Sequence, residues 1–183
     1  MNADYTADVV VAEIAPAIYI HIPFCRKKCN YCDFVSADYA DKTTDYADKY
    51  LKILAEEFSS RLSSILYPLP STLYIGGGTP SILSEKQLSF LFRTILAHLA
   101  KCATEITFEL NPESVTAEKL KLLKDFGVNR LSIGLQTFDN RLLKFLGRVH
   151  TAKDFLNCYA ITRAIGFNNI NIDLFFVIPG QKF

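Results

Sequence analysis

Short apolar stretches alternate along the chain with longer segments in which apolar residues recur every three or four positions. Stretches of about four to eight residues that are rich in Ile, Leu, Phe and Tyr are typical of strands. They lie at residues 17–22, 72–75, 105–110, 130–135 and 169–176. Because polar residues interrupt them only sparsely, we expect these strands to be buried on both faces, as the strands of parallel sheets are.

The segments between the strands have the period of amphipathic helices. Behind Asp45, apolar residues at 46, 50, 51, 54, 58 and 62 form one helical stripe. Each of the next three helices begins at a Ser or Thr suited to N-capping, and the last two end at a Gly suited to the left-handed conformation. Ser84 and Gln87 form a capping-box pattern at the start of one helix, whereas Thr116 with Gly127 and Thr151 with Gly166 mark the start and end of the other two.

Strands that alternate with helices predict an α/β fold with a parallel sheet. Right-handed crossover helices would curl about five such strands into a partial barrel of the TIM type. A complete eight-stranded barrel takes about 250 residues, whereas this chain has 183 and stops just after the fifth predicted strand. We therefore expect one α/β domain, a parallel barrel that is incomplete at its carboxyl end.

Composition and charge exclude several other classes of protein. Half of the residues are hydrophobic and the formal net charge is +1, which argues against disordered or coiled-coil proteins and against nucleic acid as the partner. Residues 1–16 contain no Lys or Arg and therefore lack the basic start of a signal peptide. No apolar run is long enough to cross a bilayer. We expect a cytoplasmic protein without a transmembrane segment.

Polar or glycine-rich residues follow every predicted strand. In parallel barrels the working residues come from the carboxyl ends of the strands and the loops behind them, so we expect these residues to meet at one rim. They are residues 21–32, 76–81, 109–113 and 134–138, and Asp173 within the last strand.

Three of the five cysteines lie close together, as Cys25-x3-Cys29-x2-Cys32. In a reducing compartment such spacing indicates a metal site before a disulfide. Three thiolates from one loop can hold three irons of a 4Fe-4S cube and leave the fourth iron open. A structural zinc with His21 as fourth ligand is the alternative, although zinc sites prefer two separate Cys pairs.

The remaining features are less specific. Cys102 and Cys158 stand alone in apolar helical stretches, where we expect buried, inert thiols. Three consecutive glycines, 76–78, allow a ligand to approach the backbone closely, or they form only a tight turn. No dinucleotide or Walker motif is present, so phosphate binding is not implied.

The cysteine motif, with Tyr31 before its third cysteine, resembles the cluster signature of the radical S-adenosylmethionine (SAM) superfamily, and residues 76–79 resemble that superfamily's glycine loop. Within it, five segments are similar to the oxygen-independent coproporphyrinogen III oxidases and the related HemW-type heme chaperones. These segments are residues 19–25, 76–81, 131–138, 146–150 and 173–181.

The resemblance implies ligands for two cofactors, a 4Fe-4S cluster and SAM, and in the HemW-type branch also heme. Cys25, Cys29 and Cys32 would hold the cluster, with Tyr31 beside it. The positions that would contact SAM are Tyr19, Gly77, Gly78, Thr79, Glu109, Gln136, Arg148 and Asp173. Purely structural roles stay open for four of them: Glu109 and Gln136 as strand caps, Arg148 at the end of its helix, and Asp173 as a turn acceptor.

Two departures from the oxidases favour the heme-chaperone branch, whose members bind heme and deliver it to acceptor proteins. Phe34 stands where the oxidases resembled here have a further cysteine, and only eighteen residues precede Tyr19. The alternatives are an oxidase of porphyrin biosynthesis and an inactive truncated relative, so enzymatic activity is left open. We expect residues 1–16 to be an N-terminal segment and residues 17–183 to be a radical SAM core that ends before the last strand and a heme-binding C-terminal domain. Val177 stands where the family usually has Gly.

Overall fold

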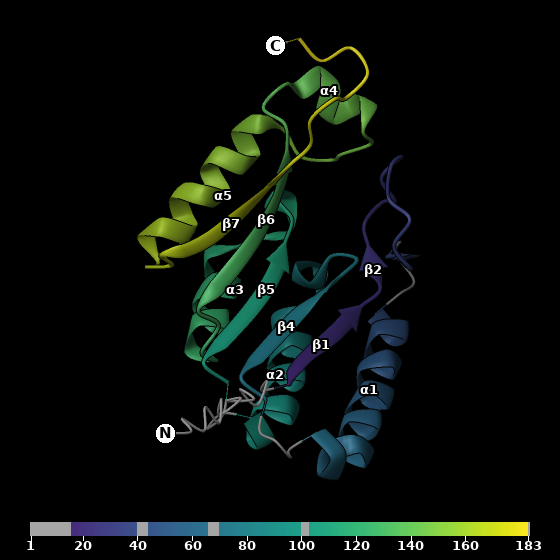
Figure 1. Ribbon diagram of the computed structural model, residues 1–183, viewed down its shortest axis with the longest axis vertical. Helices are drawn as coiled ribbons and strands as arrows, with labels where there is room; N and C mark the ends of the chain where they lie inside the picture. The colour runs from purple at the N-terminus through teal and green to yellow at the C-terminus, as the bar shows by residue number, and fades with distance from the viewer. Residues whose placement is uncertain (1–15, 40–43, 66–69, 100–102, 183) are drawn as a thin grey trace, which may run out of the picture.

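The computed structural model describes residues 16–39, 44–65, 70–99 and 103–182, and it confirms the α/β class with a parallel sheet (Figure 1). Five parallel strands pair in the order in which they occur in the sequence. The strands are β1 (Ala17–Ile22), β4 (Thr72–Gly77), β5 (Glu105–Leu110), β6 (Arg130–Gln136) and β7 (Asn169–Leu174). A sequential order of parallel strands is the arrangement of a barrel, and five strands make a partial one.

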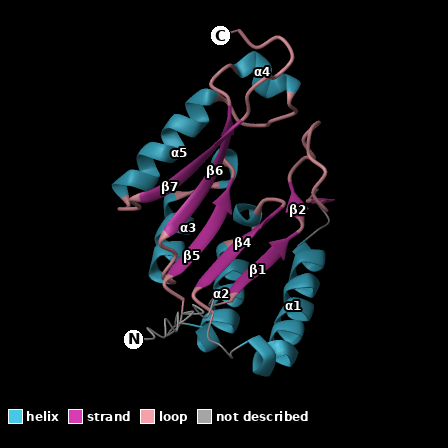
Figure 2. Cartoon of the chain, in the orientation of Figure 1, coloured by secondary structure: helices cyan, strands magenta, loops and turns pink. Residues whose placement is uncertain are grey.

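Four long helices connect the strands and pack together against one face of the sheet (Figures 1 and 2). They are α1 (Thr44–Ile65), α2 (Glu85–Leu99), α3 (Ala117–Asp125) and α5 (Ala152–Ala164). The predicted helix ends are confirmed: Ser84 and Gln87 form reciprocal hydrogen bonds, and Thr151 begins α5 in a capping box with Asp154. Within the described parts of the chain, no helix combines the length and apolarity needed to cross a bilayer.

The expectation that the strands are buried on both faces holds for β6 and most of β5, but it fails for the edge strands β1 and β7. The two faces of the sheet also differ in chemistry. Ile75, Phe108 and Ile133 point into the core beneath the helices and are fully buried. The alternating positions on the other face carry polar side chains such as Glu109 and Ser132, which line a cavity. The inner face of this partial barrel therefore lines a polar cavity, whereas apolar side chains fill the interior of a complete barrel.

Strand β7 departs furthest from the prediction. It ends at Leu174, and nearly all of its residues are exposed. Within the described residues β7 pairs only with β6, so its outer edge has no neighbouring strand. Position at the sheet edge explains the exposure, because an edge strand is covered on one side only.

Small elements that the sequence did not predict hold residues 24–38, the cysteine segment, in place. Strands β2 (Phe24–Cys25) and β3 (Ala37–Asp38) pair in parallel and bring the two ends of this segment together. The short helix α4 (Asn140–Phe145) follows β6, and its last carbonyl accepts a 2.7 Å hydrogen bond from the side chain of Asn30. The loop that carries the cysteines is thereby fixed at both ends and in the middle.

Candidate functional site

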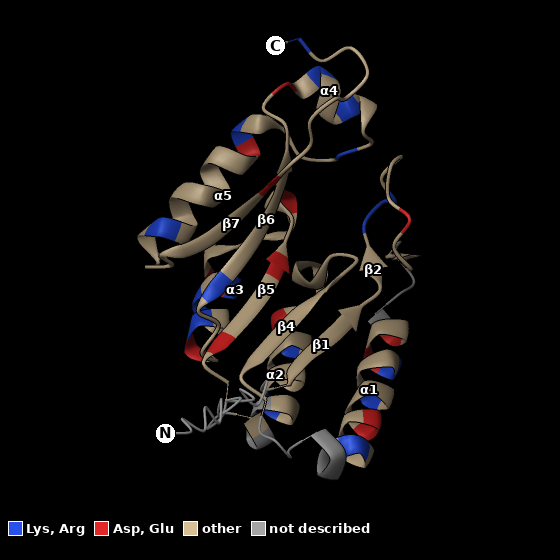
Figure 3. Cartoon of the chain, in the orientation of Figure 1, with Lys and Arg blue, Asp and Glu red and all other residues tan. Residues whose placement is uncertain are grey.

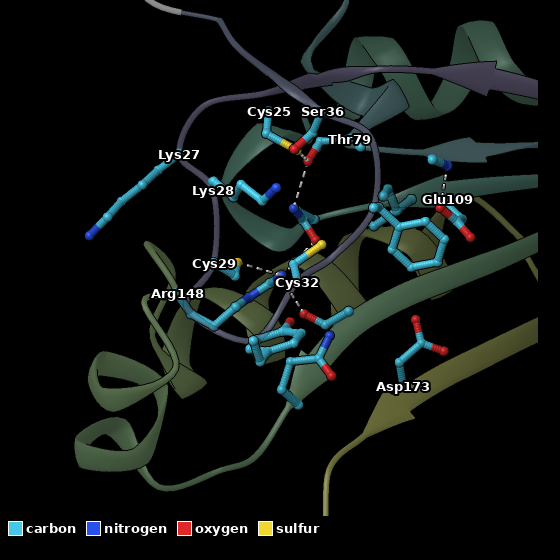
Figure 4. A pocket seen from close by; sticks show the side chains of 18 of the residues that line it. Cys25, Lys27, Lys28, Cys29, Cys32, Ser36, Thr79, Glu109, Arg148 and Asp173 are labelled. Atoms are coloured by element: carbon cyan, nitrogen blue, oxygen red, sulfur yellow. Dashed lines mark hydrogen bonds between the residues drawn. The ribbon is translucent and has the colours of Figure 1, made fainter.

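A cavity of about 250 Å³ opens at the carboxyl ends of the strands, enclosed on one side by the cysteine segment (Figure 4). It brings together every residue that the sequence assigned to a site except Tyr19. From the cysteine segment come Cys25, Cys29, Tyr31 and Cys32; from the strands and the loops behind them come Gly77, Gly78, Thr79, Glu109, Gln136, Arg148 and Asp173. Five strands thus deliver these side chains to one rim, as the sequence predicts.

The three cluster-motif cysteines are half-buried and lie around one side of the cavity (Figure 4). Among the described residues, no three His, Cys, Asp or Glu side chains converge as they would around a single metal ion. The Thr79 hydroxyl points at Cys25 Sγ from 3.6 Å, and Arg148 Nη1 points at Cys29 Sγ from 3.8 Å. Burial raises the pKa of the Cys25 thiol, with the hydrogen bond from Thr79 acting against it and the nearby Cys32 adding to it. Donors directed at sulfur are suited to stabilising thiolate ligands.

The glycine loop allows two chain segments to approach closely. Gly77 has a φ of +114°, and a Cβ at this position would lie 2.6 Å from His21 Nδ1. At Gly78 a Cβ would lie 2.7 Å from the carbonyl oxygen of Phe24, next to Cys25. The Gly78 amide also donates to the Ile22 carbonyl over 2.8 Å. Only glycine fits against the cysteine segment here, which is more than a plain tight turn requires.

Glu109 is the central carboxylate of the cavity's acidic side. Its Oε1 accepts a 2.6 Å hydrogen bond from the Tyr74 hydroxyl, and its Oε2 accepts one of 3.0 Å from the Gly77 amide. Burial raises the pKa of Glu109; these two hydrogen bonds oppose the rise, and the negative charge of Asp173 adds to it. Tyr19 does not line the cavity but stacks on Tyr74 with ring centroids 5.7 Å apart, so it contacts the site through Tyr74.

Two further predicted residues hold their positions through strand geometry. Asp173 accepts hydrogen bonds from Ser132 Oγ at 3.2 Å and from Asn171 Nδ2 at 2.7 Å. Gln136 has a φ of +72° at an irregularity in the pairing of β6 with β7. A left-handed conformation is uncommon for a residue other than glycine and marks a constrained position. The hydrogen bonds that Asp173 accepts thus come from the side chains of Ser132 in β6 and Asn171 in β7, and not from a turn.

Arg148 extends into the cavity from the loop that follows α4. Its Nη2 atom donates to Asn111 Oδ1 at 2.6 Å and to the Gly134 carbonyl at 2.8 Å. Asn111 in turn donates from Nδ2 to Thr79 Oγ1 over 3.0 Å. The side chain of Arg148 therefore binds groups at the strand ends and does not cap the carboxyl end of the preceding helix α4. Figure 4 shows Arg148 and Lys28 on the cysteine side of the cavity, opposite Glu109 and Asp173.

Other predictions have clear structural outcomes. The His21 ring does not line the cavity; its Nε2 is 2.9 Å from the Val35 carbonyl and its Nδ1 is 3.4 Å from the Tyr19 hydroxyl. It thus does not complete a zinc site with the cysteines. Cys158 is buried as expected, and burial raises its pKa to about 11. Cys102 lies outside the described residues.

Several lining residues were not assigned a role from the sequence. Asn111 contacts Arg148 and Ser132 contacts Asp173. Ser132 lies in β6 and Asn111 directly follows β5, and both line the cavity. Phe175 packs edge-on against Tyr31 with centroids 4.5 Å apart, and burial raises the pKa of Tyr31 to about 12. For Asn111 the signal was its place directly behind a predicted strand; the contact with Phe175 has no sequence signal.

Comparison with known proteins agrees with this geometry. Residues 19–183 match the family described as "Radical SAM superfamily". The chain is 45% identical over 165 residues to "Heme chaperone HemW" of Bacillus subtilis, covering 89% of this chain and 43% of that protein. Against "Heme chaperone HemW" of Escherichia coli the identity is 37% over 167 residues, covering 91% and 44%.

A solved structure also matches, that of the coproporphyrinogen III oxidase HemN from Escherichia coli, described as a radical SAM enzyme. The TM-score is 0.78 at 32% identity, over 91% of this chain and 38% of that one. The chain therefore spans less than half the length of the relatives it matches. Because the family match extends over the described sheet, the glycine loop and all three cysteines of the cavity, the chain belongs to the radical SAM superfamily.

Proposed function

We propose that the cavity binds a 4Fe-4S cluster through Cys25, Cys29 and Cys32, and SAM beside it. The observation that carries this proposal is that three thiols from the loop behind β1 and the polar ends of four further strands face the same cavity. The thiols lie around one side of it, which suits a cube whose irons each take one thiolate. The donors Thr79 and Arg148 face the sulfurs and would stabilise the thiolates.

The two charged sides of the cavity are complementary to SAM. A guanidinium such as that of Arg148 pairs with a carboxylate, and carboxylates such as Glu109 and Asp173 accept hydrogen bonds from ribose hydroxyls or an ammonium. When bound and reduced, the cluster would supply the one-electron chemistry that cleaves SAM reductively. The residues of this chain would orient SAM and exclude water from it.

Within the superfamily we propose a heme chaperone, a protein that binds heme and passes it to an acceptor protein. The curated relatives named "Heme chaperone HemW" support this, at up to 45% identity. Phe34 supports it as well, because this residue lines the cavity, 62% exposed, where the oxidases resembled here have a cysteine. The oxidase is the second candidate, favoured by the match to HemN.

The proposal includes the organisation and location of the protein. Residues 17–183 would form the radical SAM core, and heme ligands would lie in a C-terminal domain. A cytoplasmic location follows from the cysteine chemistry, because thiolate ligands and free thiols persist in a reducing compartment.

The decisive experiment compares heme transfer with porphyrin oxidation in a form of the protein that extends through the proposed C-terminal domain, after anaerobic reconstitution with iron and sulfide. We expect heme to bind, seen by its absorption band, and to move to an apo-hemoprotein in the presence of SAM and a reductant. Coproporphyrinogen III should remain unchanged under the same conditions, with the Escherichia coli oxidase as the positive control. Formation of protoporphyrinogen IX would support the oxidase, and failure to bind heme or to transfer it would contradict the chaperone.

A further inference from the structure

His150 is a buried histidine behind the cavity wall, to which neither the sequence nor the proposed function gives a task. It is 2% exposed and does not line the cavity. Its ring instead contacts Arg148, which does: Nδ1 of His150 lies 3.3 Å from Arg148 Nη2. A buried polar side chain in this place requires partners for both ring nitrogens.

The partners of the ring fix its hydrogen-bonding roles. His150 Nε2 lies 3.2 Å from the carbonyl oxygen of Leu135, which can only accept, so Nε2 carries the hydrogen. In the neutral ring, the lone pair of Nδ1 is then free to accept from Arg148. The backbone carbonyl thus orients the ring, and the ring presents an acceptor to the guanidinium.

Glu113 approaches the same edge of the ring as Arg148. Its Oε2 lies 3.5 Å from His150 Nδ1 and has no hydrogen-bond partner among the described residues. Burial opposes the charge of Glu113, but the backbone amide of Glu113 and the positive charge of Arg148 act against burial, and the pKa of Glu113 is lowered. The carboxylate therefore stays ionised and balances the positive charge of the half-buried Arg148.

Arg148 has little freedom to move without affecting the cysteines. Its Nη2 has two hydrogens and lies near acceptors on Asn111, Gly134 and His150, so one hydrogen is shared between two of them, while Nη1 points at Cys29 Sγ. Through Asn111 and Thr79 the same network reaches Cys25 Sγ. A displacement of the guanidinium would change the donors that face two of the three sulfurs.

We propose that His150, held by the Leu135 carbonyl and lying next to Glu113, is a positioning residue that aims Arg148 at the cysteine side of the cavity. It thereby sets the affinity for SAM and the reduction potential of the cluster. This inference deepens the proposed function and rests on it. Partners behind a first layer of ligands typically change affinity by about 10- to 100-fold when they are removed.

The test compares His150→Leu with His150→Gln in the full chain with a reconstituted cluster. Leu fills the space without an acceptor, whereas the Gln amide can donate to Leu135 and accept from Arg148. We expect His150→Leu to weaken SAM binding, followed by calorimetry, by roughly tenfold or more and to shift the midpoint potential of the cluster. His150→Gln should restore both to near the wild-type values.

Glu113→Gln should weaken SAM binding in the same direction, with Glu118→Gln as the matched control at a fully exposed carboxylate. A readout independent of the loaded cluster is the side-chain nitrogen resonance of Arg148 in the apoprotein. It should shift in His150→Leu and not in Glu118→Gln. Thermal unfolding of each variant reports whether the fold is retained.

The outcomes separate this inference from the proposed function. If the wild-type chain forms no cluster or binds no SAM, the proposed function fails, and the inference with it. If the wild type binds SAM and Arg148→Lys loses affinity while His150→Leu matches the wild type, only the inference is overturned. Equal losses in His150→Leu and His150→Gln would likewise overturn it, because the acceptor would then have no specific role.

Discussion

The Glu109 carboxylate accepts a 3.0 Å hydrogen bond from the backbone amide of Gly77 and so joins the end of β5 to the glycine loop behind β4. The two residues come from neighbouring strands of the sheet. Because the Gly78 and Thr79 amides also donate backbone hydrogen bonds to Ile22 and Phe24, hydrogen bonds connect the acidic side of the cavity to the start of the cysteine segment. The site is therefore arranged before any ligand binds, which lowers the cost of binding.

Replacing Cys25, Cys29 or Cys32 singly by Ala should abolish the 4Fe-4S cluster. Each thiolate would hold one iron, and no other Cys lines the cavity among the described residues. Iron and sulfide analysis with the broad absorption near 400 nm of such clusters provides the measurement. Cys158→Ala is the control and should keep the cluster, since Cys158 is buried in α5. Stoichiometric zinc in place of iron would contradict the assignment.

Asp173→Ala should weaken the binding of SAM by about 0.5–1.5 kcal/mol, the usual net contribution of one hydrogen bond. Asp173 faces the cavity and is held there by Ser132 and Asn171. Calorimetry on the reconstituted chain measures the change, with the exposed Asp125→Ala as the control. Unchanged affinity in Asp173→Ala would show that SAM lies elsewhere in the cavity.

Gly77→Ala should be far more harmful than Gly180→Ala, although both glycines have positive φ. Gly77 has a φ of +114° and Gly180 a φ of +82°. The left-handed strain of about 1–2 kcal/mol is common to both variants. Only Gly77→Ala adds a clash, because its Cβ would lie 2.6 Å from His21, whereas nothing lies within 4 Å at Gly180. Denaturant unfolding of the two variants should separate them; equal losses would mean that the loop can shift.

Val177→Gly should raise the free energy of unfolding by about 0.5–1 kcal/mol. Val177 has a φ of +61° and is exposed, so it carries left-handed strain without burying its side chain. Relief of about 1–2 kcal/mol of strain is partly offset by the greater entropy of glycine in the unfolded chain. The exposed Val149→Gly, without positive φ, should be neutral or destabilising. A loss of stability in Val177→Gly would refute the strain.

The thiol of Cys158 should resist alkylation in the folded protein up to about pH 10. Burial raises its pKa from 9.0 to about 11, so between these values the native state keeps a proton that the unfolded chain has lost. Any stability due to this thiol therefore falls as the pH rises above 9. Mass spectrometry after iodoacetamide treatment at pH 8 should find Cys158 modified only in denaturant. Rapid modification under native conditions would contradict its burial.

Much of the fold could be predicted because its signals are local. Thr116 and Thr151 cap α3 and α5 as expected, and Gly127 and Gly166 adopt the positive φ that ends each helix. The short helix α4 was missed although Asp139 caps it, since six residues carry too little periodicity. The two-residue strands β2 and β3 have no pattern at all. Burial on both faces was predicted for all five strands and failed at β1 and β7, because apolar composition does not reveal which strands lie at the edges of a sheet.

The candidate site was predictable where residues follow strands and unpredictable where contacts depend on tertiary packing. The cysteines and Glu109 could be placed at one rim because parallel strands end together. Tyr19 was assigned to that rim and instead stacks on Tyr74, since its strand lies at the edge of the sheet. The contact of His150 with Arg148 spans two residues in sequence, yet its meaning depends on Leu135 and Glu113, which only the folded chain brings near.

The pairing of β2 with β3 closes the cysteine segment into a loop whose ends are already joined by backbone hydrogen bonds of 2.6 Å, from Ala37 to Pro23 and from Tyr39 to Cys25. Closing a loop costs chain entropy, and in this protein the backbone pairing of the fold offsets that cost before any metal binds. The cluster would then bind to a loop that is already folded, whereas a zinc finger folds only when its ion binds. Removal of the cluster iron by a chelator should therefore leave the protein folded.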